Sequence, residues 1–185
     1  MAPQDSPAKK LESLFREFVG EAIPPLFPVS PQEMPEPFKN LLDHEDHMTV
    51  TMEANYGELM EIQVLKESQG ANTYARMLRL NGEKTKRTVL FGAMRVRLDF
   101  LPQLVRQEIL AKKTPLGRIL IKHHVMRKLE LVQLLKLELG EEQRHWFGSI
   151  PPGPIYGRVA IIHCHGLPAI ELFEVAAPLG PDPSA

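Results

Sequence analysis

Alternation of apolar and polar residues in the middle of the chain constrains the fold most. Residues 58–66, 73–80 and 84–98 are rich in Val, Ile, Leu and Thr, and from residue 94 to 99 each apolar side chain is followed by a charged one. A period of two residues is typical of a strand with one buried and one solvated face. Asn81-Gly82 suits the positive φ angles of a tight hairpin turn. The sequence therefore predicts antiparallel strands here.

Three further segments extend this sheet. Residues 158–165 and 168–176 are apolar and flank Gly166, so they predict a last hairpin. Residues 126–139 fit two patterns, because their Leu and Val residues match helical spacing and also match strand alternation in short stretches. We interpret them as a strand, which gives a sheet of about six strands.

Helices are predicted apart from these strands. Ser6-Pro7 has the pattern of an N-cap followed by a first helical residue, and apolar residues from 11 to 19 recur at helical spacing. A second helix opens at Pro102 and ends near residue 113, and a short one runs from Pro115 to about residue 120. Hairpins with helices set apart indicate an α+β fold.

The length of 185 residues predicts a single domain that spans residues 1–185. Within it, residues 1–40 would form the N-terminal helix and a loop, broken by prolines between 24 and 37, that wraps the surface. Residues 179–185 would form a flexible tail.

Charge and cysteine content exclude several classes of protein. The net charge of −1 provides no excess that would attract nucleic acid or an anionic membrane. Cys164 is the one cysteine, so no internal disulfide can form, and a reducing compartment fits. Residues 1–10 are polar, and no apolar run is long enough to span a bilayer. We therefore predict a cytoplasmic protein without a nucleic-acid or membrane partner.

Seven histidines raise the hypothesis of a metal site. His44 and His47 would lie close together on a helix, and His163 and His165 would share one face of a strand. Each pair supplies two ligands, whereas a zinc site needs three or four, so we predict no metal and no other cofactor. Cys164 points to the opposite face from its two neighbouring histidines, which disfavours Cys–His catalysis and predicts a buried, inert thiol.

The remaining candidates could form a site for a small anion. Arg76 lies inside a predicted strand, where an inward guanidinium requires an anionic partner. Residues 114–117 form a turn into a helix, whose first N–H groups can bind an anion. Glu171 and Glu174 interrupt an apolar strand, and an inward one would suit proton transfer. A structural Arg–Glu pair is the alternative.

Five short motifs, in their order along residues 42–178, resemble those of the chorismate pyruvate-lyases. They are Met48-Thr49, Tyr74-Ala-Arg76, Thr114-Pro-Leu-Gly-Arg-Ile-Leu120, Tyr156-Gly-Arg158 and Gly166-Leu-Pro168, followed by a strand that bears glutamate. The resemblance implies a six-stranded antiparallel sheet with helices that cover an enclosed ligand site. It also implies the conversion of chorismate to 4-hydroxybenzoate and pyruvate without a cofactor.

The same resemblance implies roles for single residues. Arg76 and a glutamate of the last strand would be catalytic and would also bind the substrate, and Met48 and Leu116 would bind it through their backbone groups. The flanking prolines favour Glu174 as this glutamate, with Glu171 as second choice.

Two alternatives to the lyase stay open. Lyase-like domains also serve as effector-binding modules of transcription regulators, so the chain could be a non-catalytic domain that binds an aromatic carboxylate. The family often has an acidic residue after the strand arginine, where this chain has Met77. A metal-dependent enzyme that uses the paired histidines is the other alternative. For the lyase and for the binding domain alike, the partner is a small molecule, chorismate or a related aromatic carboxylate. We expect a monomer or a small homo-oligomer.

Overall fold

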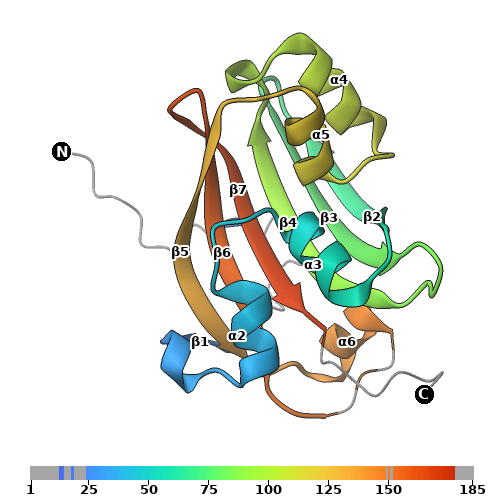
Figure 1. Cartoon of the computed structure of the whole chain (residues 1–185), viewed down its shortest axis with the longest axis vertical. Helices are drawn as coiled ribbons and strands as arrows, with labels where there is room; N and C mark the ends of the chain where they lie inside the picture. The colour runs from blue at the N-terminus through green and yellow to red at the C-terminus, as the bar shows by residue number, and fades with distance from the viewer. Residues whose placement is uncertain (1–12, 15–17, 19–23, 149, 151, 178–185) are drawn as a thin grey trace.

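One antiparallel sheet of seven strands organises the molecule (Figure 1). The computed structural model describes residues 13–14, 18, 24–148, 150 and 152–177. In chain order the elements are β1 (Leu26–Val29), η1 (Pro31–Glu33), α2 (Glu36–Leu42), α3 (Met48–Tyr56), β2 (Met60–Gln69), β3 (Thr73–Gly82), β4 (Thr88–Arg97), η2 (Leu98–Phe100), α4 (Gln103–Ala111), α5 (Leu116–Lys122), β5 (Arg127–Leu137), α6 (Glu141–Arg144), η3 (His145–Phe147), β6 (Ile155–Cys164) and β7 (Leu167–Ala176).

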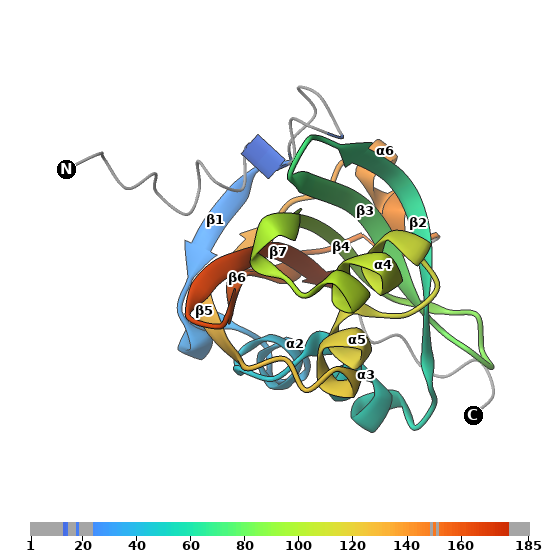
Figure 2. The same ribbon diagram turned by 90° about the horizontal axis from the view of Figure 1, so that it is seen from above.

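The strand order is β1-β5-β6-β7-β4-β3-β2. Two antiparallel blocks, β2 to β4 and β5 to β7, join where β4 pairs with β7 over Leu90↔Ala176 to Val96↔Ile170. Helices α2, α3, α4 and α5 lie on one face of the sheet (Figures 1 and 2). The α+β fold with a single antiparallel sheet is therefore confirmed.

The opposite face is also buried. Phe91 of β4 stacks on Trp146 of η3 with ring centroids 4.4 Å apart. The predicted N-terminal helix lies largely outside the described residues, but Leu14 and Phe18 from this region are buried. Residues 179–185 also lie outside the described residues.

The proline-rich segment is where the sequence prediction was wrong. It was expected to be a loop, but it contains β1, η1 and α2, and β1 pairs with β5 as the seventh strand. Pro28 is tolerated because β1 is an edge strand, and Pro37 because it lies in the first turn of α2. Helix α3 was not predicted either.

The turn between β3 and β4 also differs from the prediction. Asn81-Gly82 does not form it, because β3 continues through Gly82 and the chain turns over residues 83–87, with Lys86 at φ 57°. The carboxylate of Glu58 accepts hydrogen bonds from the backbone N–H groups of Lys84 and Thr85 at 2.8 and 3.1 Å. This contact from outside the hairpin stabilises a longer turn.

Strand β5 confirms the interpretation of residues 126–139 and explains their mixed pattern. Its register shifts by one residue at Val132, between Leu131 and Gln133. A bulge of this kind reverses the faces on which side chains point. Leucines before the bulge therefore face the helices, whereas Leu135 and Leu137 face the other side.

Candidate functional site

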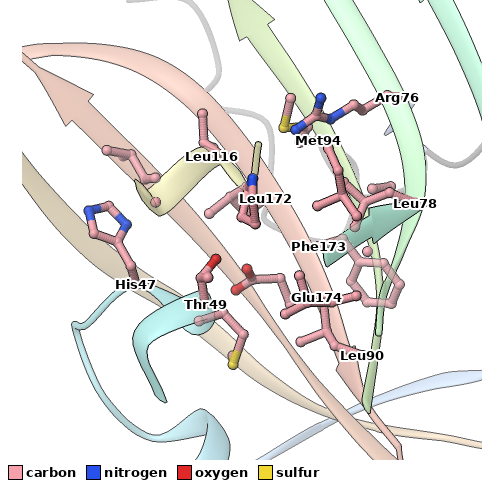
Figure 3. Close-up of a pocket in the computed structure, with 18 of the residues that line it drawn as sticks. His47, Thr49, Arg76, Leu78, Leu90, Met94, Leu116, Leu172, Phe173 and Glu174 are labelled. Atoms are coloured by element: carbon pink, nitrogen blue, oxygen red, sulfur yellow. The ribbon is translucent and has the colours of Figure 1, made fainter. Parts of the chain in front are cut away.

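A cavity lies between the sheet and the first turns of α3 and α5 (Figure 3). Its volume is about 60 Å³ for the centres of water-sized spheres, and one water molecule needs about 10–15 Å³ on this scale. Apolar side chains form most of the wall, and the polar ones belong to His47, Thr49, Arg76 and Glu174. Such a cavity suits a small organic molecule with few polar groups.

The four first-choice site residues from the sequence all line this cavity. Arg76 and Glu174 reach it from the sheet, Met48 from α3 and Leu116 from α5. The second choice, Glu171, lies on the other face of β7, where Arg95 Nη1 donates a hydrogen bond to its carboxylate at 3.1 Å. Strand alternation separates the two glutamates, because they are three residues apart.

Arg76 and Glu174 stand at two ends of the cavity floor. Arg76 pairs with Met94, which pairs with Leu172, whereas Glu174 pairs with Gly92, two residues before Met94 in β4. With strands about 4.8 Å apart and a rise of about 3.4 Å per residue, the Cα atoms of Arg76 and Glu174 lie roughly 12 Å apart. The two side chains therefore flank a space above Gly92.

Arg76 is a fully buried arginine whose hydrogen-bonding capacity is only partly used. Its Nη1 donates to the carbonyl oxygen of Ile109 at 3.3 Å, but Nε and Nη2 have no hydrogen-bond partner among the described residues. Burial lowers the pKa of Arg76 below its ordinary value, and the nearby phenol of Tyr74 and carboxylate of Glu67 oppose this effect. By hydrogen-bond geometry Nε and Nη2 thus have no acceptor in the described part of the chain, although the phenol of Tyr74 lies close enough to interact with the guanidinium.

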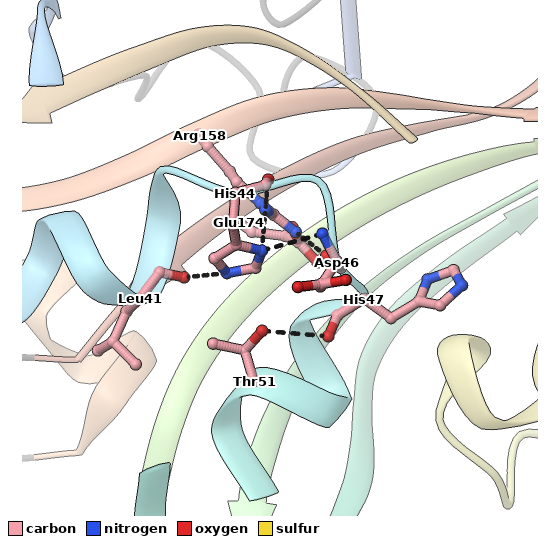
Figure 4. A network of polar contacts seen from close by, with 7 residues as sticks. All are labelled: Leu41, His44, Asp46, His47, Thr51, Arg158 and Glu174. Carbon is pink, nitrogen blue, oxygen red and sulfur yellow. Dashed lines mark hydrogen bonds and ion pairs between the residues drawn. The ribbon is translucent and has the colours of Figure 1, made fainter. Parts of the chain in front are cut away.

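Arg158, by contrast, has a hydrogen-bond partner for each nitrogen of its guanidinium group. The sequence did not assign it a role, although it lies in the motif Tyr156-Gly-Arg158. It is fully buried, and its Nε donates to Glu174 Oε2 at 2.7 Å. Its Nη1 donates to the carbonyl oxygen of His44 at 2.8 Å and its Nη2 to that of Asp46 at 3.2 Å (Figure 4). Arg158 therefore fixes both the carboxylate of Glu174 and the loop that leads into α3.

Gly157 of the same motif allows a close approach of two strands. A Cβ atom at this position would lie 2.7 Å from the backbone oxygen of Glu174. No side chain fits at that distance without movement of β6 or β7. The glycine therefore keeps the strand that carries Glu174 in place.

His47 lies where α3 and α5, the two helices over the cavity, meet. Burial, together with the neighbouring Arg127, lowers the pKa of His47 to about 4, so its ring is neutral at pH 7. Arg127 Nε donates a hydrogen bond to His47 Nε2 at 2.5 Å. A Cβ atom on Gly117 of α5 would lie 2.9 Å from His47 Cβ, and Arg118 of α5 forms an ion pair with Glu53 of α3. Helices α3 and α5 are thus held against each other over the cavity.

The first turn of α3 offers backbone donors to the cavity. His47 is the N-cap of this nine-residue helix, and Met48 and Thr49 follow it. The first N–H groups of an α-helix have no partner within the helix. Met48 and Thr49 both line the cavity, and binding of a ligand by the backbone of Met48 stays a prediction.

The histidine pairs do not form a metal centre in the described part of the chain, where no group of three potential ligands occurs. His44 Nε2 lies 2.7 Å from the carbonyl oxygen of Leu41, and burial lowers the pKa of His44. His163 Nε2 lies 2.8 Å from Glu130 Oε2. Cys164 is buried, which raises the pKa of its thiol to about 11, so the thiol is a poor nucleophile.

Comparison with known proteins finds relatives in structure only. No protein-family model and no curated protein matches the sequence. The effector domain of PhnF from Mycobacterium smegmatis is 8% identical with a TM-score of 0.54, over 72% of this chain and 89% of that chain. A second structure, of PhnF itself, is 9% identical with a TM-score of 0.53, over 93% and 94%. The chain has the fold of the PhnF effector domain.

At this identity the likeness shows the fold alone. A third structure, the possible transcriptional regulator YydK from Bacillus subtilis, is 12% identical with a TM-score of 0.46, and the match covers 64% of this chain and 59% of that chain. This chain thus spans less than two thirds of YydK. The expected chorismate pyruvate-lyase activity is not shown by these comparisons. None of the described helices is long and apolar enough to cross a membrane.

Proposed function

We propose that this chain is a binding domain for a small aromatic carboxylate, held in the cavity under α3 and α5. The free donors of Arg76 carry the proposal. A buried cation costs several kcal/mol unless an anion compensates it. A planar guanidinium matches a carboxylate with two parallel hydrogen bonds, and two nitrogens of Arg76 are buried without an acceptor among the described residues.

The walls favour an aromatic ring between the polar groups. Leu78, Leu90 and Leu172 line the cavity together with Met48 and Met94. Branched apolar side chains exclude water from a flat ring, and methionine sulfur makes favourable contacts with aromatic rings.

Polar groups at the other end favour a hydroxyl on the ring. Glu174 directs its carboxylate into the cavity beside the hydroxyl of Thr49 (Figure 3). A ligand hydroxyl can donate a hydrogen bond to this carboxylate while Arg76 binds the carboxylate of the ligand. 4-Hydroxybenzoate is the simplest molecule with both groups, and the likeness to an effector domain supports a binding role.

A ligand panel tests the proposal by calorimetry. We expect 4-hydroxybenzoate to bind, benzoate to bind about tenfold more weakly because it lacks one charge-assisted hydrogen bond, and 4-hydroxybenzyl alcohol to bind at least a hundredfold more weakly because it lacks the carboxylate. Equal affinity for the alcohol and the acid would contradict it.

Chorismate pyruvate-lyase activity is the second candidate, favoured by one observation. Arg76, Glu174, Met48 and Leu116, the residues that the resemblance implies for substrate binding, line the same cavity. In this reaction the bond between the ring and the enolpyruvyl oxygen breaks, the ring loses a proton and becomes aromatic, and pyruvate leaves. The protein would contribute positioning and electrostatic stabilisation.

Incubation with chorismate separates the two candidates. Pyruvate released at a rate that depends on protein concentration, and that is abolished in Arg76→Ala, supports the lyase. Saturable binding of chorismate or 4-hydroxybenzoate without pyruvate release supports the binding domain alone.

A further inference from the structure

Gly92 lies in the cavity floor beside Glu174, at a position where glycine is unfavourable. It is part of β4, a central strand, between Leu78 of β3 and Glu174 of β7, and it lines the cavity. Glycine weakens the interior of a strand, and it usually marks a bulge, a positive φ or a close backbone approach.

None of these reasons applies to Gly92. The register of β4 is regular at this residue, and its φ is not in the positive range. A Cβ atom would lie 3.4 Å from the backbone oxygen of Phe173, 3.5 Å from Leu90 Cδ2 and 3.9 Å from Leu78 Cδ1, which are ordinary van der Waals distances. The fold therefore accepts alanine here.

Gly157 shows the contrast. It also lies in a central strand, β6, but its Cβ atom would lie 2.7 Å from the backbone oxygen of Glu174. Gly157 is required by the packing of the strands, whereas Gly92, which lines the cavity, is not.

We infer that Gly92 determines which ligands fit, by leaving room for a polar substituent at the end of the ring opposite the carboxylate. The inference rests on the proposed function. Gly92 lies in the same row across the sheet as Glu174, whereas Arg76 lies in the next row. A side chain at position 92 therefore occupies the Glu174 end of the cavity and leaves the Arg76 end open.

The substitution Gly92→Ala tests the inference with two readouts. Since alanine fits and reduces the freedom of the unfolded chain, Tm should rise by about 2 °C. Affinity for 4-hydroxybenzoate should fall at least tenfold, while affinity for benzoate, which has no substituent at that end, should change less than threefold. The matched variant Gly157→Ala should lower Tm by several degrees, because its Cβ atom has no room.

Three other outcomes are possible, and each would contradict a specific part of this inference. A lower Tm for Gly92→Ala would show that the backbone needs the glycine. A higher Tm with unchanged affinity for 4-hydroxybenzoate, or with equal losses for both ligands, would show that Gly92 does not select the ligand. Absence of binding of both acids to the unaltered protein would overturn the proposed function, and this inference with it.

Discussion

At the scale of residues, two fully buried arginines stand in opposite situations. Arg158 binds the carboxylate of Glu174 and two backbone carbonyl oxygens, whereas Arg76 binds one carbonyl oxygen. Removal of Arg158 leaves the charge of Glu174 buried alone, whereas removal of Arg76 leaves the carbonyl oxygen of Ile109 without its donor but no carboxylate without an ion-pair partner. Arg158 therefore stabilises the fold, whereas the role that we propose for Arg76 is to bind the ligand.

Replacement of each arginine by methionine distinguishes these roles without ligand. Arg158→Met should lower the free energy of unfolding by about 3–5 kcal/mol, because Glu174 and the loop carbonyls lose their donors. Arg76→Met should have a free energy of unfolding equal to that of the unaltered protein or higher by up to about 2 kcal/mol. Urea denaturation measures both. A large loss of stability in Arg76→Met would mean that its charge is compensated within the protein.

The two glutamates of β7 give the second prediction. Glu174→Gln removes the charge that faces the cavity, so affinity for 4-hydroxybenzoate should fall about tenfold, as expected for a lost charge-assisted hydrogen bond. If the chain is a lyase, pyruvate release should fall by about 10²–10⁴. Glu171→Gln is the matched control on the opposite face and should change neither quantity more than twofold. The reverse ranking in calorimetry would place the ligand on the other side of the sheet.

At the scale of elements, irregularities in the strands decide which side chains meet. Between β6 and β7 the register shifts at Ile162, and this shift brings Arg158 opposite Glu174 instead of Phe173. Periodicity in the sequence predicted the strands, and alternation predicted that one glutamate faces inward. It could not predict the partner of Arg158, because one extra residue in a strand leaves the local pattern almost unchanged.

Helix α3 shows a second limit of prediction from sequence. Its capping residue, His47, and the preceding loop lack a strong start signal, and tertiary contacts supply the stability instead. Arg158 holds the loop, and Arg127 holds the ring of His47. These contacts come from strand residues 80 and 114 positions away along the chain, so a local window of sequence does not contain them.

The pH dependence of stability tests the contacts of this loop. The pKa of His47 is about 4 in the folded chain and about 6.5 in an unfolded one. Between these values the unfolded chain binds more protons, so the free energy of unfolding should decrease as the pH falls from about 6.5 to 4, by up to about 3 kcal/mol. Urea denaturation at pH 7 and pH 5 measures the loss.

Two variants complete this measurement. His47→Gln should reduce the loss of stability between pH 7 and pH 5, whereas His165→Asn, at an exposed position in the β6–β7 turn, should leave it unchanged. The lowered pKa of His44 acts in the same direction, so part of the dependence should persist in His47→Gln. An unaltered dependence in that variant would show that His47 is not buried as a neutral ring.

At the scale of the whole molecule, one seven-stranded sheet and the helices α3 and α5 enclose a small cavity with a cationic end and an anionic end. The motifs that resemble the lyases come from separate parts of the chain, and the fold brings Met48, Arg76, Leu116 and Glu174 together. The same architecture occurs in the effector domain of PhnF. The fold therefore provides a cavity, and the binding that we propose there depends on its few polar residues.

Calorimetric titration of 4-hydroxybenzoate into the unaltered protein and into Arg76→Met tests the central claim most directly. The account predicts saturable binding at one site per chain in the unaltered protein, and affinity at least thirtyfold weaker in a folded Arg76→Met, since a bidentate charged contact contributes about 2 kcal/mol or more. Equal affinity in the two proteins would contradict the assignment of Arg76 as the anion-binding residue.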